Sequence, residues 1–308
     1  MPSNLGSYLG LAKEAIYGTP VAPAFFLAIS NPADVHAEVP LQDVPNTTAL
    51  GPLATEPGIR HGVFNAQAAA DPAGIGALLS ALFGAPVTTG TAAPYAHAFT
   101  PKNAQSGFTF EALDRVAKHV LAGGKTNQAR LSHTPDGYLQ ASFDGIGQDK
   151  TEPAGAASVV TLPTQFFTQR QLVVTVDGVN VSALSESVDV TLNMPKAGLV
   201  GFGQAMVAGV EPTGEGDASV AITLRDDGVD RFTPFLAATP KVVDLKWTIS
   251  ADYSLEVNFP YAVLTADPKL RSNTDLGIAR VALNYRALSQ GTDMVTVTLI
   301  NHQDGTLY

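Results

Sequence analysis

The chain has 308 residues, no cysteine and a formal net charge of −10. An apolar fraction of 45% with 15% charged residues indicates a folded globular protein, long enough for two domains of ordinary size. The absence of cysteine excludes disulfides, thiolate metal sites and cysteine nucleophiles. The acidic balance argues against a surface that grips nucleic acid, because phosphate binding needs clustered Lys and Arg. The acidic balance is compatible with a surface along which nucleic acid passes without being bound.

Neither a membrane span nor a signal peptide is visible. The longest apolar run, residues 75–87, is shorter than the roughly 20 residues that a bilayer requires. The first ten residues are polar, unlike a secretory signal. We therefore expect a soluble protein that is made in a cytoplasm and does not insert into membranes.

The first 62 residues predict two strands and a long loop. The strands are expected over residues 7–13 and 24–29, separated by a turn at residues 17–20, Tyr-Gly-Thr-Pro. Residues 31–62 are rich in Pro, Asn, Thr and Gly and predict an extended loop. A loop of this length usually has a functional or contact role.

Residues 63–84 predict a strand, a break and a short apolar helix. Asp71 is a good N-cap, and Pro72 occupies the first helical position, where proline is tolerated. Gly84 marks the end of the helix. The apolar residues of the helix follow one another at helical spacing: Ile75, Leu78, Leu79 and Leu82.

The same order of features returns in residues 219–240, with a strand, an Asp-containing break, an apolar set and a stop. Asp226 follows Asp71 by 155 positions (226 against 71), and Glu211 follows Glu56 by the same interval (211 against 56). This interval is close to half the chain length, although residue identity between the copies is low. We therefore predict a folding unit that is used twice.

The remaining strand predictions are spread over both halves, and a second Gly-rich loop is expected over residues 198–216. The fold class is predicted as mainly β, with two tandem β-sandwich or open-barrel units that each carry a short packed α-helix. The units are expected at 1–150 and 169–308, with a linker over 151–168. The further strands are expected over 95–100, 108–114, 116–133, 138–146, 171–176, 188–192, 242–249, 253–259, 278–285 and 294–300, with a hairpin turn at Asp177-Gly178.

Motifs for catalysis or cofactor binding are absent or weak. The six histidines show no metal-ligand spacing, and neither a nucleophile elbow nor a phosphate-binding loop occurs. We therefore expect no enzyme and no cofactor. Asp226, Asp227 and Asp230 around a glycine are the only weak metal candidates. Helix capping by Asp226 or Asp227 is favoured, because the twelve-residue calcium loop with its terminal Glu is absent.

Five other side chains have a structural interpretation. Trp247 alternates with apolar neighbours and is expected in the core. Phe166 and Phe167 are interpreted as sealing the two halves or capping a neighbouring subunit. Lys13 and Glu14 are interpreted as a solvated strand edge.

The N-terminal segment GSYLGLAKEAIYGTPVAP resembles the start of phage major tail tube proteins from long, non-contractile, siphovirus-type tails. Residues 7–10, 13–14 and 17–20 carry the resemblance. A strand–helix–strand unit after a Gly-rich loop, and a last strand that leads into residues 299–301, extend it over nearly the whole chain. The resemblance implies a structural protein, not an enzyme, whose stacked rings form a channel for DNA passage into the host.

The resemblance also implies partners and a location. Single-domain subunits of this class form hexameric rings. For a duplicated chain, trimeric pseudo-hexameric rings and hexameric rings both stay open. The implied partners are tail tip or initiator, tape measure and tail terminator proteins, while genomic DNA passes without specific binding. The protein would belong to the virion tail and be assembled in the host cytoplasm.

Assembly is expected to use the N-terminal segment and two long loops, residues 46–60 and 198–214. The ring-stacking candidates in these loops are Asn46, Leu50, Glu56, Arg60, Phe202, Met206 and Glu211. Three acids in strand-like surroundings are candidates for the channel lining: Asp144, Asp189 and Glu256.

Other functional classes stay open at this stage. A secreted or surface β-sandwich binding module would expose aromatic-rich loops and normally carry a signal peptide, and neither is evident. A hydrolase on a β-scaffold would show convergent acids and His near glycines. The tube of a contractile tail or secretion system and a tail terminator would share the fold, and the N-terminal signature favours the non-contractile tail.

Overall fold

Most of the described chain is β-structure, because alternating apolar and polar residues let a strand bury one face and expose the other. The computed structural model describes residues 8–31, 33–44, 54–102, 105–113, 117–133, 137–153, 163–199, 206–226, 228–268, 270–273, 278–291 and 293–308. Within these ranges, no helix is both long and apolar enough to span a bilayer.

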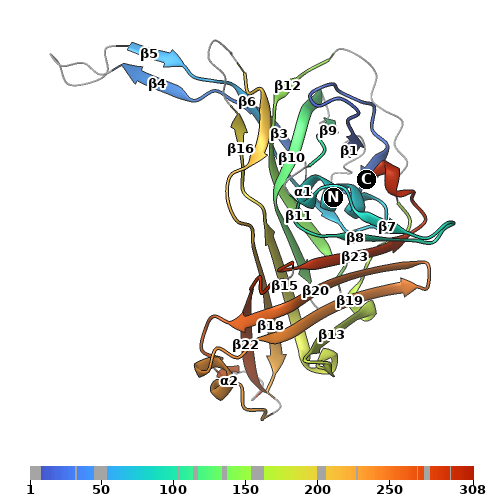
Figure 1. Cartoon of the computed structure of the whole chain (residues 1–308), viewed down its shortest axis with the longest axis vertical. Coiled ribbons are helices and arrows are strands. Elements are labelled where there is room, and N and C mark those ends of the chain that lie inside the picture. The colour runs from blue at the N-terminus through green and yellow to red at the C-terminus, as the bar shows by residue number, and fades with distance from the viewer. Residues whose placement is uncertain are drawn as a thin grey trace.

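Sheet I is a long antiparallel sheet that runs through both halves of the chain (Figure 1). The halves join where β10 pairs with β15, with Leu131 opposite Val190. Its strands, in spatial order, are β3 (Asp34–Glu38), β6 (His61–Ala69), β11 (Gln140–Gly147), β10 (Lys118–His133), β15 (Ser185–Asn193), β18 (Asp217–Arg225), β22 (Ile278–Ala287) and β21 (Leu270–Asn273).

Sheet II packs against sheet I and completes a sandwich. It combines strands from both halves, because β8 of the first half pairs with β23, which lies near the end of the chain. The end of β20 also pairs with β22 and so links the two sheets. The order in sheet II is β7 (Val87–Thr89), β8 (Tyr95–Phe99), β23 (Thr296–Asn301), β20 (Tyr253–Leu264), β19 (Lys241–Ser250), β13 (Leu172–Val176) and β14 (Val179–Asn180).

Sheet III covers the first half and shares β10 with sheet I. A bend at Gly123, with φ of 63°, lets the 16-residue strand β10 pair first in sheet III and then in sheet I. The strand pairings of the described residues close no ring, so the sandwich keeps open edges. The order in sheet III is β2 (Phe25–Leu27), β1 (Tyr8–Lys13), β9 (Phe108–Leu113), β10 and β12 (Asp149–Thr151).

The helix predicted after residue 71 is present as α1 (Gly74–Phe83), and all ten of its residues are buried. Asp71 Oδ1 accepts hydrogen bonds from the Ala73 and Gly74 amides at 3.0 and 2.7 Å. Gly84 ends the helix, and its amide donates to the Ser80 carbonyl. The predicted cap, apolar face and stop of α1 are therefore confirmed, with the helix starting two residues after Pro72.

The second helix, α2 (Phe232–Leu236), forms at the repeated position but is only five residues long. None of its residues is buried, so the expectation of a packed helix in the second half is wrong. Asp230 caps it by accepting from the Phe232 and Thr233 amides, whereas Asp226 accepts from the Gly228 amide instead. Asp227, the other predicted cap, lies outside the described residues. Three 3-10 turns complete the helical elements: Gln169–Gln171, Ser182–Leu184 and Gly305–Leu307.

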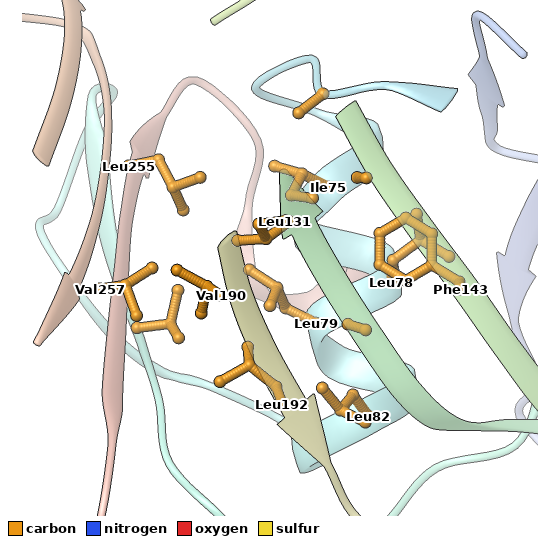
Figure 2. Packing of buried hydrophobic residues seen from close by; sticks show 14 of the residues in the cluster. Ile75, Leu78, Leu79, Leu82, Leu131, Phe143, Val190, Leu192, Leu255 and Val257 are labelled. Carbon is orange, nitrogen blue, oxygen red and sulfur yellow. The ribbon is translucent and has the colours of Figure 1, made fainter. Parts of the chain in front are cut away.

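The two sheets and α1 enclose one hydrophobic cluster that contains residues of both halves. Figure 2 shows Val190 of sheet I, Val257 of sheet II and Leu79 of α1 in this cluster. Trp247 is fully buried, which confirms its predicted place in the core. Phe167 is also fully buried, and its backbone bonds to both Ala70 and Leu139.

Two stretches predicted as long loops contain strands instead. Residues 31–62 include β3 and a hairpin made of β4 (Leu41–Val44) and β5 (Ala54–Pro57). Residues 198–216 include most of a second hairpin, β16 (Lys196–Leu199) with β17 (Gly209–Pro212). Both hairpins have four-residue strands rich in turn-forming residues, which hides their pairing from a sequence pattern.

The division into units at 1–150 and 169–308 stays a prediction. Pairings between β10 and β15 and between β8 and β23 cross the proposed boundary. The structure describes part of the predicted linker at 151–168. Strand β12 (Asp149–Thr151) ends at its first residue, and residues 163–168 are also described.

Candidate assembly surfaces

Two hairpins lie at one end of the long axis of the molecule, and β4–β5 extends away from the body (Figure 1). They occupy equivalent places in the chain, because β16 starts 155 positions after β4 (196 against 41) and β17 starts 155 after β5 (209 against 54). Their registers also correspond, with Leu41 opposite Pro57 and Lys196 opposite Pro212. We call β4–β5 the arm.

The root of the arm contacts the second hairpin. Arg60 and Met206 form a parallel bridge, and the Val207 amide donates to the Arg60 carbonyl at 3.1 Å. Arg60 Nη2 also donates to Asp149 at 2.9 Å. The structure therefore brings together two of the predicted stacking residues, Arg60 and Met206.

The other predicted stacking residues are divided between exposed and undescribed positions. Glu56 is exposed on β5, and Glu211 occupies the equivalent place on β17. Asn46, Leu50 and Phe202 lie outside the described residues.

The second hairpin rests on a buried cation that the sequence analysis missed. Lys125 Nζ donates to the Val210 carbonyl at 2.5 Å and lies 3.9 Å from a Glu211 oxygen. The same ammonium lies 5.5 Å from the centre of the Tyr17 ring. Burial lowers the pKa of Lys125, and Glu211 opposes this effect. Tyr17 of the N-terminal signature thus helps to position β17.

Glu14 has a structural role in the same signature, and its interpretation as a solvated edge is wrong. The carboxylate is buried and accepts from the Gly18 amide, the Thr109 hydroxyl and the Gly123 amide at 2.7, 2.9 and 2.8 Å. Burial raises the pKa of Glu14, while these hydrogen bonds lower it. Two of the three donors are about a hundred residues away in sequence, so no local pattern marks them.

A second buried lysine anchors the start of β16. Lys196 Nζ contacts three carbonyl oxygens, those of Leu82 at 3.3 Å, Met194 at 3.1 Å and Thr126. Burial lowers the pKa of Lys196 to about 7, and attraction to Asp144 opposes the shift. This anchor fixes the second hairpin to the end of α1 and to β10.

The outward face of sheet I is polar and continuous across both halves. Its charged side chains pair with one another along neighbouring strands: Arg130 Nε donates to Asp189 at 2.6 Å, and Arg286 Nε donates to Asp217 at 2.9 Å. Between these pairs lie mainly small polar or amide side chains. They include Asn65, Gln67, Gln128, Ser132, Ser142, Thr191, Ser219, Thr223 and Asn284.

The three predicted channel-lining acids divide between opposite faces of the sandwich. Asp189 lies on the outward face of sheet I, and Asp144 lies on the same face, half-buried near Lys196. Glu256 lies on the outward face of sheet II, where it pairs with Lys246 at 2.7 Å. A channel along one face of the sandwich can therefore take Asp144 and Asp189, or Glu256, but not all three.

Two of the three weak metal candidates accept hydrogen bonds from backbone amides. Asp226 accepts from the Gly228 amide, and Asp230 caps α2. Asp227 lies outside the described residues. In the part of the chain that the structure describes, no group of three or more His, Cys, Asp or Glu side chains is arranged to hold a metal ion.

Comparison with known proteins identifies one family. A family model described as phage tail tube protein matches residues 5–289, nearly the whole chain. No curated protein matches it.

Proposed function

The chain belongs to the phage tail tube protein family, and from this premise we propose that it is the major tube subunit of a long, non-contractile phage tail. Membership gives it a structural role in a phage tail tube, and it makes the chain a virion component that self-assembles with other tail proteins. The finer proposal is that subunits close into rings, and that the stacked rings form the channel for DNA passage into the host.

The observation that carries this proposal is the outward face of sheet I. It runs through the six neighbouring strands from β6 to β22 as a surface of mainly small polar side chains. Its arginines lie against acids: Arg130 pairs with Asp189, Arg286 pairs with Asp217, and Arg225 and Arg280 both pair with Glu186. Phosphate binding needs cations that are available to it, so a surface of this kind gives DNA little to hold. We assign this face to the channel, with Asp189 in its lining.

The repeated elements support a ring of three chains with pseudo-six-fold symmetry. The sequence β3–β4–β5–β6–α1 is followed by β15–β16–β17–β18–α2, and β3 pairs with β6 as β15 pairs with β18. Two tube-like units, at 1–150 and 169–308, account for this correspondence. The pairing of β10 with β15 would then be the intrachain form of a contact that neighbouring chains repeat. Six chains per ring is the alternative.

The hairpins are assigned to contacts between rings. They leave the sandwich at one end. All four residues of β5 are exposed, and Ala197, Leu199 and Glu211 are exposed on the second hairpin. The proposed partners are further copies of the chain, a tail tip or initiator complex, a tape measure protein and a tail terminator. Assembly is proposed to take place in the host cytoplasm.

Negative-stain electron microscopy of the concentrated protein tests the proposal. Stacked rings or hollow tubes are expected, alone or after addition of tail-tip complexes. Dispersed monomers under both conditions would contradict it and favour a binding module of the same fold.

A further inference from the structure

The second hairpin, β16–β17, is held at its base by the first half of its own chain. The Met194 amide donates to the Asn127 carbonyl at 2.7 Å, and Lys196 Nζ donates to the Thr126 carbonyl. Both base side chains are buried, and the Lys196 ammonium is attracted to Asp144 on β11. We call this contact of the hairpin base the seat.

The base of the arm repeats the base of the second hairpin. The Gly58 amide donates to the Pro40 carbonyl at 2.6 Å, and the Thr213 amide donates to the Pro195 carbonyl at 3.0 Å. Donors and acceptors are both 155 positions apart (213 against 58, and 195 against 40). The two hairpins therefore leave sheet I with the same local hydrogen bonding.

The side chains at the base of the arm are uncovered, unlike their equivalents in the second hairpin. Val39, at the place of Met194, is 42% exposed. Leu41, at the place of Lys196, is 70% exposed. Met194 and Lys196 are each 7% exposed. A two-stranded hairpin is only marginally stable in water by itself, so an arm with this apolar base gains from a partner.

The registers of sheet I locate the equivalent of the seat in the second half. One row of cross-strand neighbours in the first half consists of Val35, Phe64, Gly145 and Thr126. The matching row in the second half, which starts 155 positions later (190 against 35), consists of Val190, Val220, Tyr285 and Leu264. Asp144 therefore corresponds to Asn284, and Asn127 corresponds to Thr265.

A hollow of about 320 Å³ lies at this place in the second half. Asn284 and Thr265 are among its lining residues. It also has two acids, Asp189 and Asp217, and each is already paired with an arginine. The hollow therefore suits an uncharged side chain, whereas the same place in the first half holds the Lys196 ammonium.

The residues that differ between the two places change together. In the seat, the cation of Lys196 lies near the anion of Asp144. Their equivalents, Leu41 on the arm and Asn284 in the hollow, are both uncharged. Loss of one charge is thus matched by loss of its counter-charge on a different surface, which is what a contact between the two surfaces requires.

A second cation changes its strand but keeps its place. In the first half, Lys125 on β10 lies 3.9 Å from Glu211 of the hairpin, and its cross-strand neighbour on β11 is apolar. In the second half, the equivalent pair is Val263 and Arg286, so the cation lies on the neighbouring strand. Arg286 already donates to an acid of β18 at 2.9 Å, and a guanidinium carries further N–H donors. It can therefore also face Glu56, the equivalent of Glu211 on the arm.

Resting on the proposed tube function, we propose that the base of the arm of one chain occupies this hollow on the neighbouring chain of the same ring. The Leu41 side chain would enter the hollow and contact Asn284. The Val39 amide would donate to the Thr265 carbonyl, as in the seat. Two different surfaces meet, so the contact repeats around the ring and closes there. The arm beyond its base keeps its assignment to contacts between rings.

Cross-linking of a two-cysteine chain tests the contact, because the natural chain has no cysteine. Chains with Leu41→Cys and Asn284→Cys are assembled and treated with a short bis-maleimide, and the denatured products are separated by size. A contact within rings gives a covalent ladder that ends at the number of chains in a ring, three in the proposed ring and six in the alternative. The matched control combines Leu41→Cys with Val87→Cys, an exposed position on β7. The control should give about tenfold less product, because docking raises the local concentration of the two thiols.

The outcomes separate this inference from the function on which it rests. Assembled tubes with equal cross-linking in both proteins, or with a ladder that continues beyond six chains, would overturn the docking and leave the tube function standing. A failure of the natural chain to form rings or tubes, with or without tail-tip complexes, would overturn both.

Substitution of Leu41 alone gives a second measurement. Leu41→Asp should leave the subunit folded by circular dichroism, because the side chain is exposed in the isolated chain. It should lower the yield of tubes by about tenfold or more, because a carboxylate in the hollow would lie unpaired beside Asp189 and Asp217. Leu41→Met should assemble normally. A normal yield of tubes from Leu41→Asp would also overturn the docking.

Discussion

Replacing Asp71 by Asn should remove a pH dependence from the stability of the protein. The Asp71 carboxylate is 1% exposed, and burial raises its pKa to about 6. An unfolded chain returns the pKa to about 3.9. The folded state therefore binds the proton more tightly, so the stability from this group is full below about pH 4 and is lost as the pH rises through 6. A difference of about two pKa units corresponds to about 3 kcal/mol.

Urea denaturation at pH 4 and pH 7.5 measures this effect. Asn cannot ionise, but its side-chain oxygen can still accept from the Ala73 and Gly74 amides. The free energy of unfolding of the natural protein should therefore fall relative to Asp71→Asn by about 2.4 kcal/mol between the two pH values, because the unfolded carboxyl is only about half protonated at pH 4. Asp304→Asn is the control: Asp304 is exposed, and the Thr306 amide lowers its pKa, so its effect has the opposite sign. Identical pH profiles for the natural protein and Asp71→Asn would refute the reasoning.

Three further predictions concern buried groups. Glu14→Ala should lower the free energy of unfolding by about 2–4 kcal/mol, because it leaves the buried Thr109 and Gly123 donors unpaired, while Glu14→Gln should cost less; chemical denaturation compares them. The natural protein should gain stability relative to Lys196→Met between pH 7 and pH 10, because the pKa of Lys196 is about 7 in the folded state and the unfolded chain binds more protons in this range. Denaturant titrations at several pH values measure this, and an equal change of the free energy of unfolding with pH in both proteins would contradict it. Leu79→Ala in α1 should cost about 2–5 kcal/mol, whereas Leu236→Ala in exposed α2 should change thermal stability by less than about 0.5 kcal/mol.

Local patterns predicted α1 well because its determinants are close in sequence. The cap at Asp71, the apolar spacing and the stop at Gly84 all lie within fourteen positions. The Asp177-Gly178 turn was predictable for the same reason, and both residues have positive φ, as a tight hairpin turn requires.

The sequence-based predictions fail where contacts between distant parts of the chain determine the structure. The apolar set at the second helix predicts packing, yet Phe232 and Leu236 are exposed among the residues that the structure describes. The long strand β10 serves two sheets because Gly123 bends it, which a weak alternation does not reveal. Glu14 is held by donors from other strands, so its spacing along the chain gave no sign of its burial.

The candidate surfaces were predicted by region more than by residue. The two loops do contain equivalent hairpins, and Arg60 meets Met206 between them. The alternation of residues along a strand indicates which side chains share one face of that strand, but it does not indicate to which sheet the strand belongs. For that reason Asp189 and Glu256 were grouped, although they lie on opposite faces of the sandwich.

A cryo-electron microscopy reconstruction of the assembled protein tests the central claim most directly. We expect a hollow tube of stacked three-chain rings, with the outward face of sheet I, including Arg130 and Asp189, lining the channel. A tube in which sheet II and Glu256 face the channel would contradict the assignment of the lining, and particles without a channel would contradict the tube function itself.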